Sequence, residues 1–272
     1  MFVSPSITLD RVSKRFEAKS ALEHVSATIQ PGELIAIIGK SGAGKTTLLR
    51  CLACSIPVSE GVIRFGDQDL AALHGTALRL YRARVGMIYQ QFNLVRRLRV
   101  LDNVLISRLP HLIGWRRWAA LGRYFDAGQQ EVALRCLDHV GLLDRVWQRT
   151  DTLSGGEQQR VAIAKILAQE PQVILADEPV ASLDVMNGAL VMETLRRIAV
   201  AAGITVIANL HHVEYACRYA DRVLGLRNGR LVFDGPPAGL TEAVVADLFG
   251  DAPGDAPGPT PMAVGEAIWV SS

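Results

Sequence analysis

The residues best suited to chemistry form a glycine-rich segment at residues 39–47, which follows an apolar run at 34–38. Glycines let a backbone turn where side chains would clash, so successive N–H groups can point at a polyphosphate seated on the next helix. Lys45 then supplies charge to the β- and γ-phosphates, and the Thr46 hydroxyl can ligate Mg²⁺. The alternative is a glycine-rich turn without a ligand. We expect contacts to a polyphosphate from Gly39, Ser41, Gly42, Ala43, Gly44, Lys45, Thr46 and Thr47.

Two adjacent acids, Asp177 and Glu178, follow the short apolar run 173–176. A carboxylate at the end of a buried strand beside the phosphate segment is where Mg²⁺ needs its protein ligand, so Asp177 is the expected metal residue. Glu178 points to the other side of an extended chain and can hold an attacking water. Adjacent acids on a loop are commonly only solvated, but four buried-type residues before them argue against that reading.

A second anion site is predicted where Ser154, Gly155 and Gly156 open a long helix. Two glycines at a helix N-terminus leave N–H groups free at the positive end of the helix dipole. The site lies some hundred residues from the first one. The sequence therefore raises the question of whether one phosphorylated molecule uses both sites.

Three further side chains have a plausible role and an ordinary alternative. Phe16 could stack on a purine ring, or it could be a core residue. Gln90 ends the apolar run 85–89 and could reach Mg²⁺ or the attacking water, although a solvated glutamine is the alternative. His211 follows the apolar run 204–208 and could bond a γ-phosphate; the rival is a metal-binding pair with His212, whose side chain diverges on extended chain.

The pattern of the chain predicts an α/β fold with a mostly parallel sheet and helices on both faces. Alternating runs at 7–12 and 25–29 indicate an antiparallel β-layer ahead of the central sheet. Further strands are expected at 34–38, 61–66, 85–89, 173–176 and 204–208, a helix at 72–84, and a hairpin around Asn228 and Gly229. Residues 91–151 show helical periodicity without a strong strand, which indicates an inserted α-helical subdomain.

Composition limits the classes of function. The chain has 272 residues and a formal charge of +2, with basic residues spread along it, so nucleic acid is not an expected partner. The N-terminus lacks the pattern of a signal peptide, and no run of 18 apolar residues occurs, so we expect no membrane span. The four cysteines suit reduced, buried positions, although Cys51 and Cys54 have the C-x-x-C spacing of redox or metal sites.

Basic and aromatic residues gather in the predicted insertion. Trp115 and Trp118 flank two arginines, and three more arginines lie within residues 96–99. Charges of this kind usually form a solvated face. Exposed tryptophans are less usual, so a docking surface for a partner or a headgroup layer is the alternative.

Over residues 5–240 these segments resemble the nucleotide-binding subunit of ATP-binding cassette (ABC) transporters. Residues 153–158 carry the resemblance, because they look like the cassette signature, and Gln158 belongs to it. By this resemblance residues 39–47 are the Walker A loop, Phe16 stacks on adenine, and Gln90 links Mg²⁺ to the membrane subunits. Asp177 and Glu178 become the Walker B aspartate and catalytic glutamate, Asp184 belongs to the loop that crosses a dimer, and His211 is the switch histidine.

The resemblance also implies cofactors and partners. The cofactors are ATP and Mg²⁺, and two copies pair head to tail, so that the signature of one closes over the ATP held by the other. Transmembrane permease subunits dock on the helical subdomain, and a periplasmic solute-binding protein acts through them. The expected place is the cytoplasmic face of the bacterial inner membrane, as a peripheral subunit.

A closer likeness is to the ATP-binding subunits of phosphonate importers, carried by residues 89–95, the tryptophan-bearing insert, 174–184 and 209–216. The implied solute is a phosphonate or a related phosphorus oxyanion. Polar amino-acid import, and export or lipoprotein release, stay open as alternatives, with a non-transport cassette ATPase behind them. A GTPase would need an N-K-x-D segment, which is missing. Val185 departs from the family, where proline commonly follows the loop aspartate.

We expect three parts along the chain. Residues 1–90 and 160–247 form the nucleotide-binding core, and residues 91–159 form the helical subdomain with the signature. Residues 248–272, with a repeated Asp-Ala-Pro-Gly, are expected to be a disordered tail.

Overall fold

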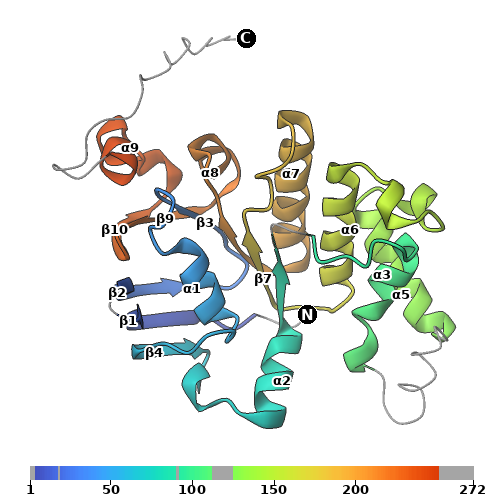
Figure 1. Ribbon diagram of the computed structural model, residues 1–272, viewed down its shortest axis with the longest axis horizontal. Coiled ribbons are helices and arrows are strands. Elements are labelled where there is room, and N and C mark those ends of the chain that lie inside the picture. The colour runs from blue at the N-terminus through green and yellow to red at the C-terminus, as the bar shows by residue number, and fades with distance from the viewer. Residues whose placement is uncertain (1–3, 18, 90–91, 112–124, 251–272) are drawn as a thin grey trace.

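The computed structural model describes residues 4–17, 19–89, 92–111 and 125–250 (Figure 1). Two sheets and a set of helices make up this part of the chain. Outside the described residues lie Gln90, Trp115, Trp118 and residues 251–272 of the predicted tail. The expected start of the tail at residue 248 is wrong, because Leu248 and Phe249 belong to the helix α9 (Glu242–Phe249) and Leu248 is buried.

The central sheet has the strand order β10-β9-β3-β8-β7-β6. Its strands are parallel except for β10, which pairs antiparallel with β9. Their bounds are β3 Leu34–Ile38, β6 Val85–Ile88, β7 Val173–Asp177, β8 Thr205–Asn209, β9 Arg222–Arg227 and β10 Arg230–Gly235. Continuous apolar runs such as β3 form these strands because both faces of the sheet are covered. The predicted parallel sheet and the hairpin at Asn228 and Gly229 are confirmed.

A second sheet has the order β2-β1-β4-β5 and antiparallel pairing. Its strands are β1 Ile7–Phe16, β2 Lys19–Ile29, β4 Glu60–Phe65 and β5 Gln68–Asp69. The antiparallel layer expected from the alternating N-terminal runs is confirmed, and the 61–66 strand joins it. β1 and β2 extend beyond the alternating runs that predicted them. Bulges shift the register between the two strands, so the two-residue alternation in the sequence breaks off before the strands end. Phe16 is the last residue of β1.

The core lies on both faces of β3. Ile35 and Ile37 pack with α1 (Lys45–Leu52) and the antiparallel sheet. Leu34, Ala36 and Ile38 pack on the opposite face, with side chains of α6 (Gly155–Leu167) and α7 (Val185–Ala202). Figure 1 shows α1 on one side of the central sheet, between the two sheets, with α6 and α7 beyond β7. Helices on both faces of a parallel sheet are thus confirmed.

The helical part is built from α3 (Val100–Ile106), α5 (Ala127–His139) and α6, which pack against one another. Because α6 begins at Gly155, the proposed boundary at residue 159 falls inside this helix. Elsewhere in the described residues the helices are α2 Gly75–Arg84, α8 Val213–Tyr219 and α9 Glu242–Phe249. Short 3₁₀ turns lie at Leu70–Ala72, Leu109–His111, Leu143–Arg145, Thr150–Thr152 and Pro237–Gly239.

The helix predicted at 72–84 begins later than expected. The Asp69 side chain accepts a hydrogen bond from Ala71 and caps the separate turn Leu70–Ala72, and His74 is extended before α2 starts at Gly75. Capping of that turn therefore competes with the first turn of the predicted helix.

No helix among residues 4–17, 19–89, 92–111 and 125–250 is both long and apolar enough to cross a bilayer.

Two leucines of α7 test the assignment of the core. Leu195 is fully buried, whereas Leu190 is 45% exposed. We expect Leu195→Ala to lower the free energy of unfolding by about 2 to 5 kcal/mol, because it removes buried atoms and leaves a cavity. The matched control Leu190→Ala should cost much less. Urea denaturation followed by circular dichroism measures both, and equal losses for the two variants would contradict this core.

Candidate functional site

The glycine-rich segment folds as a tight loop between β3 and α1. Gly39 and Gly44 have φ angles of 143° and 103°, which side-chain-bearing residues rarely adopt. A Cβ on Gly39 would lie 2.0 Å from the carbonyl oxygen of Leu226, and one on Gly44 would lie 2.4 Å from that of Ala21. Glycine is thus required twice, by φ and by close approach, where the loop passes β9 and β2.

Lys45 is the first residue of α1, and its side chain is buried at 4% exposure. Its ammonium donates to the carbonyl oxygens of Gly39 at 2.6 Å and Lys40 at 3.0 Å. Burial lowers the pKa of Lys45, and the charges of Glu178 and Asp177 oppose that shift. The loop therefore holds the ammonium inside its own curve, next to two carboxylates.

Polar side chains meet where the strands of the central sheet end. Thr46, on α1, donates from its hydroxyl to Asp177 Oδ1 at 2.9 Å. Asn209, the last residue of β8, donates from Nδ2 to the same oxygen at 2.7 Å and lies 3.4 Å from Thr46 Oγ1. Parallel pairing places Asp177 directly beside Asn209. Three elements distant in sequence thus converge on one carboxylate.

This cluster suits a hard divalent cation. Thr46 and Asp177 supply hydroxyl and carboxylate oxygens, which Mg²⁺ prefers, and Mg²⁺ usually takes only one or two protein carboxylates beside phosphates and waters. Asn209 adds a buried Oδ1 that has no hydrogen-bond partner among the described residues. The donor set therefore fits Mg²⁺ bound together with a polyphosphate.

Glu178 and His211 form a second polar pair. Glu178 Oε1 lies 2.5 Å from His211 Nε2. The expectation that Glu178 continues an extended chain is wrong, since β7 ends at Asp177 and Glu178 has a φ of 52°. A left-handed glutamate is uncommon and costs free energy, which is typical of functional sites. The turn brings the carboxylate to the histidine that follows β8.

One pocket of about 310 Å³ is lined by half of the predicted site residues. Phe16 is 47% exposed at its edge, and the Lys14 ammonium lies 5.0 Å from the centre of its ring. The core alternative for Phe16 is therefore wrong. The predicted residues that line the pocket are Phe16, Ser41, Gly42, Gly44, Lys45, Thr46, Thr47, Glu178 and His211. The structure adds Lys19, Ala21 and Asn209 to this lining. Gly39 and Ala43 shape the loop without lining the pocket.

The Ser154 end of α6 is formed by a capping box. The Ser154 hydroxyl accepts from the Glu157 N–H at 3.3 Å, and the Glu157 carboxylate accepts from the Ser154 N–H at 2.9 Å. Gln158 donates to the carbonyl of Leu153 at 2.9 Å. A Cβ on Gly156 would lie 2.4 Å from Asn187 Oδ1, so this glycine lets α6 approach α7.

Asp184 is linked to the Ser154 end of α6 through Asn187, which lies against Gly156. It caps α7 by accepting from the backbone N–H of Asn187 at 2.9 Å and from its side-chain amide at 2.6 Å. Those two bonds hold the pKa of Asp184 below its usual value. Neither Asp184 nor the predicted residues Ser154, Gly155, Gly156 and Gln158 line the 310 Å³ pocket.

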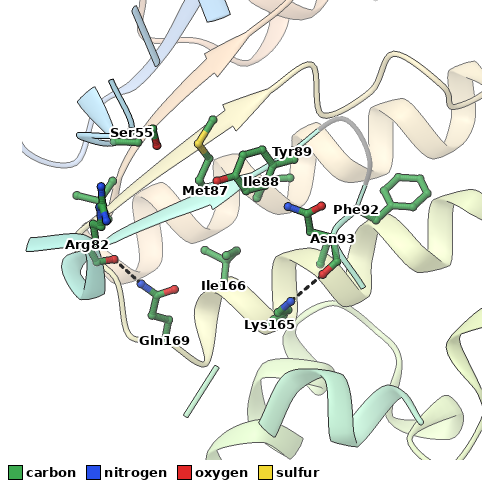
Figure 2. Close-up of a pocket in the computed structure, with 13 residues that line it drawn as sticks. Ser55, Arg82, Met87, Ile88, Tyr89, Phe92, Asn93, Lys165, Ile166 and Gln169 are labelled. Carbon is green, nitrogen blue, oxygen red and sulfur yellow. Dashed lines mark hydrogen bonds between the residues drawn. The ribbon is translucent and has the colours of Figure 1, made fainter. Parts of the chain in front are cut away.

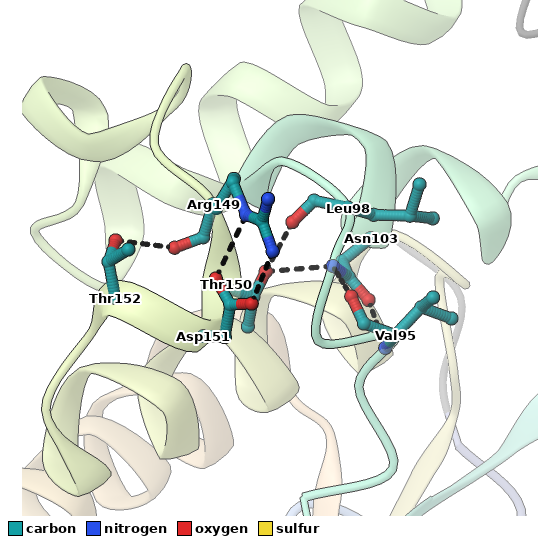
Figure 3. Close-up of polar contacts among 7 residues, drawn as sticks. All are labelled: Val95, Leu98, Asn103, Arg149, Thr150, Asp151 and Thr152. Atoms are coloured by element: carbon teal, nitrogen blue, oxygen red, sulfur yellow. Dashed lines mark hydrogen bonds and ion pairs between the residues drawn. The ribbon is translucent and has the colours of Figure 1, made fainter.

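A buried amide positions the segment before Ser154 (Figure 3). Asn103 is fully buried; its side chain exchanges hydrogen bonds with the backbone of Val95 and donates to Thr150 Oγ1 at 2.8 Å. Thr150 in turn donates its hydroxyl to the carbonyl of Leu98 at 3.0 Å. The chain following β6 is thereby bonded to the chain leading into α6.

A larger groove of about 540 Å³ lies between β6 and α6 (Figure 2). Tyr89 and Phe92 line it on either side of the residues that include Gln90. Lys165 of α6 also lines the groove, and its ammonium donates to the carbonyl oxygen of Asn93 at 2.8 Å. The predicted role of Gln90 lies outside the described residues, but its flanking residues border this groove.

Asn209 is the site residue that the sequence reasoning missed. The available signal is its position: Asn209 directly follows the apolar run 204–208, as Asp177 directly follows the apolar run 173–176. The C-x-x-C cysteines take no part in the pocket. Burial raises the pKa of Cys51 and of Cys54 to about 11, which makes thiolate chemistry unfavourable.

Known proteins match both the sequence and the fold. The family model described as ABC transporter matches residues 22–181. A phosphonates import ATP-binding protein, PhnC 2 of Rhodopseudomonas palustris (strain BisA53), is 46% identical over 243 residues, 89% of each chain. PhnC of Stutzerimonas stutzeri is 47% identical over 254 residues, 91% of each chain.

A solved structure gives the same result for the fold. The dimeric post-hydrolysis state of the ATP-binding cassette MJ0796, bound to ADP and Pi, has a TM-score of 0.74 and 30% identity, covering 86% of this chain and all of that one. The family match, the relatives and this cassette fold agree with one another. The chain belongs to the ABC transporter family.

Proposed function

We propose that this chain is the ATP-hydrolysing subunit of a bacterial importer for phosphonates or related phosphorus oxyanions. The observation that carries the ATPase assignment is the single pocket in which Lys45, Thr46 and the Glu178–His211 pair meet beside Asp177. A phosphate cradle, metal oxygens and a general base are the parts that in-line phosphoryl transfer requires. ATP with Mg²⁺ is the ligand that this combination suits.

The reaction is in-line attack of water on the γ-phosphoryl group, which breaks the bond to the β–γ bridging oxygen and releases ADP and phosphate. Lys45 balances negative charge on the β- and γ-phosphates, and Glu178 accepts the proton of the attacking water. His211 orients the Glu178 carboxylate through the 2.5 Å contact, and Phe16 offers the base a stacking face. Thr46 and Asp177 would hold Mg²⁺, which supplies charge neutralisation between the phosphates when bound.

Head-to-tail pairing of two copies is proposed for the complete site. Ser154, Gly155, Gly156, Gln158 and Asp184 lie outside the pocket of their own chain, yet the N-terminus of α6 is suited to anions. A second copy would bring that helix end onto the triphosphate. The dimeric MJ0796 cassette supports this arrangement.

Membrane subunits are proposed to dock at the helical subdomain, residues 91–159. The groove of Figure 2 supports this, because β6 of the core and α6 of the helical part both line it. Tyr89 and Phe92, which precede and follow Gln90 in the sequence, line it as well. A periplasmic solute-binding protein would deliver the solute to those subunits. The chain would then sit at the cytoplasmic face of the inner membrane.

The solute is proposed from the relatives. Both quoted relatives are named as phosphonates import proteins, and each is matched over about nine-tenths of its length. This favours phosphonate over polar amino acids.

Deletion of the gene should abolish growth on a phosphonate as sole phosphorus source but spare growth on phosphate. Complementation by the intact gene and not by Lys45→Ala would support the proposal, and normal growth of the deletion strain would refute it.

Lys45→Ala tests the cradle. Loss of a buried, charge-assisted contact of about 1.5 to 3 kcal/mol should weaken ATP binding by about 10- to 150-fold. Lys40→Ala is the control, since only the backbone carbonyl of Lys40 contacts Lys45. Titration of a fluorescent ATP analogue measures both affinities. Unchanged binding by Lys45→Ala would contradict the assignment.

Glu178→Gln tests the general base. The amide keeps the size of the side chain but cannot take a proton, so the hydrolysis rate should fall by about 10²- to 10⁴-fold while ATP still binds. Glu193→Gln, on the exposed side of α7, is the control and should keep the normal rate. Phosphate release at saturating MgATP gives the rates. A Glu178→Gln variant as fast as the control would refute this role.

A further inference from the structure

Asn209 has hydrogen-bonding capacity that the proposed reaction does not yet use. It is fully buried at the end of β8, yet it lines the nucleotide pocket. Its Nδ2 donates to Asp177 Oδ1 at 2.7 Å, while its Oδ1 is buried without a partner among the described residues. A buried carbonyl oxygen left unpaired destabilises the fold, so an unpaired one inside a site indicates a ligand or water there.

The direction of the amide follows from its neighbours. Asp177 Oδ1 accepts hydrogen bonds from both Thr46 and Asn209, so the nitrogen side of the amide must face the carboxylate. The oxygen side can then accept a hydrogen bond from a donor or contact a cation. Thr46 and Asp177 are the proposed metal ligands, and a Mg²⁺ ion usually keeps several waters, which are such donors.

We propose that Asn209 is a positioning residue of the metal site, which holds Asp177 through Nδ2 and accepts a hydrogen bond from a metal-bound water through Oδ1. This rests on the proposed function, because it assumes that Mg²⁺ enters with ATP. Groups that hold a metal ligand in place commonly account for 10- to 100-fold in metal affinity. Asn209 touches neither the γ-phosphate nor the attacking water in this role.

The test separates metal binding from nucleotide binding. Asn209→Leu keeps the branched shape of the side chain and removes both hydrogen-bonding groups. Asn209→Ser replaces the amide with a single hydroxyl, which can still donate and accept. Thr205→Val is the matched control, because Thr205 is buried at the other end of β8 and accepts from the Gly32 N–H at 3.0 Å, outside the pocket. Each variant is titrated with a fluorescent ATP analogue in EDTA. Mn²⁺ is then titrated by electron paramagnetic resonance onto protein held in excess over a non-hydrolysable ATP analogue.

We expect Asn209→Leu to bind the nucleotide in EDTA within about twofold of the wild type but to bind Mn²⁺ about 10- to 100-fold more weakly. Asn209→Ser should lose less, and Thr205→Val should change neither affinity. Wild-type Mn²⁺ affinity in Asn209→Leu would overturn the proposal. So would a loss of nucleotide affinity in EDTA as large as the loss for Mn²⁺, because that indicates general damage to the pocket. Failure of the wild type to bind the analogue would instead refute the proposed function.

Discussion

The structure depends on the common edge at which parallel strands end. β3 leads into the Lys45 loop, β7 ends at Asp177, and β8 ends at Asn209. Because these strands are parallel neighbours, side chains from three distant parts of the chain meet at one edge of the sheet. Ligands of open parallel sheets bind outside this carboxyl edge. The close passage of Gly39 and Gly44 past neighbouring carbonyls then fixes the loop against the two sheets.

The same constraint explains how much of the fold the sequence predicts. Buried parallel strands are continuous apolar runs, so β3, β7 and β8 are predictable directly from the sequence. The acids Asp177 and Glu178 are also recognisable, because they directly follow the apolar run 173–176. The order of the strands is not readable, because pairing of β3 with both β8 and β9 depends on contacts nearly two hundred residues apart. The late start of α2 depended on one local cap, that of Asp69.

The candidate site is likewise only partly predictable from the sequence. Lys45, Thr46 and Asp177 are identifiable because their spacing carries the chemistry. The direction of Glu178 was mispredicted, since a left-handed φ of 52° is a tertiary effect that an extended-strand pattern does not indicate. Asn209 was missed because one asparagine after an apolar run is not a motif. Its significance comes only from the 2.7 Å bond to Asp177.

The N-terminus of α6 lies outside the pocket of its own chain. We therefore propose that each triphosphate is shared by two copies and that its cleavage releases them. The most direct measurement is the mass of the Glu178→Gln protein by light scattering at saturating MgATP. The account predicts a dimer that contains two ATP molecules and reverts to monomers when nucleotide is removed. A protein that stays monomeric with ATP bound, even when its membrane subunits are supplied, would contradict it.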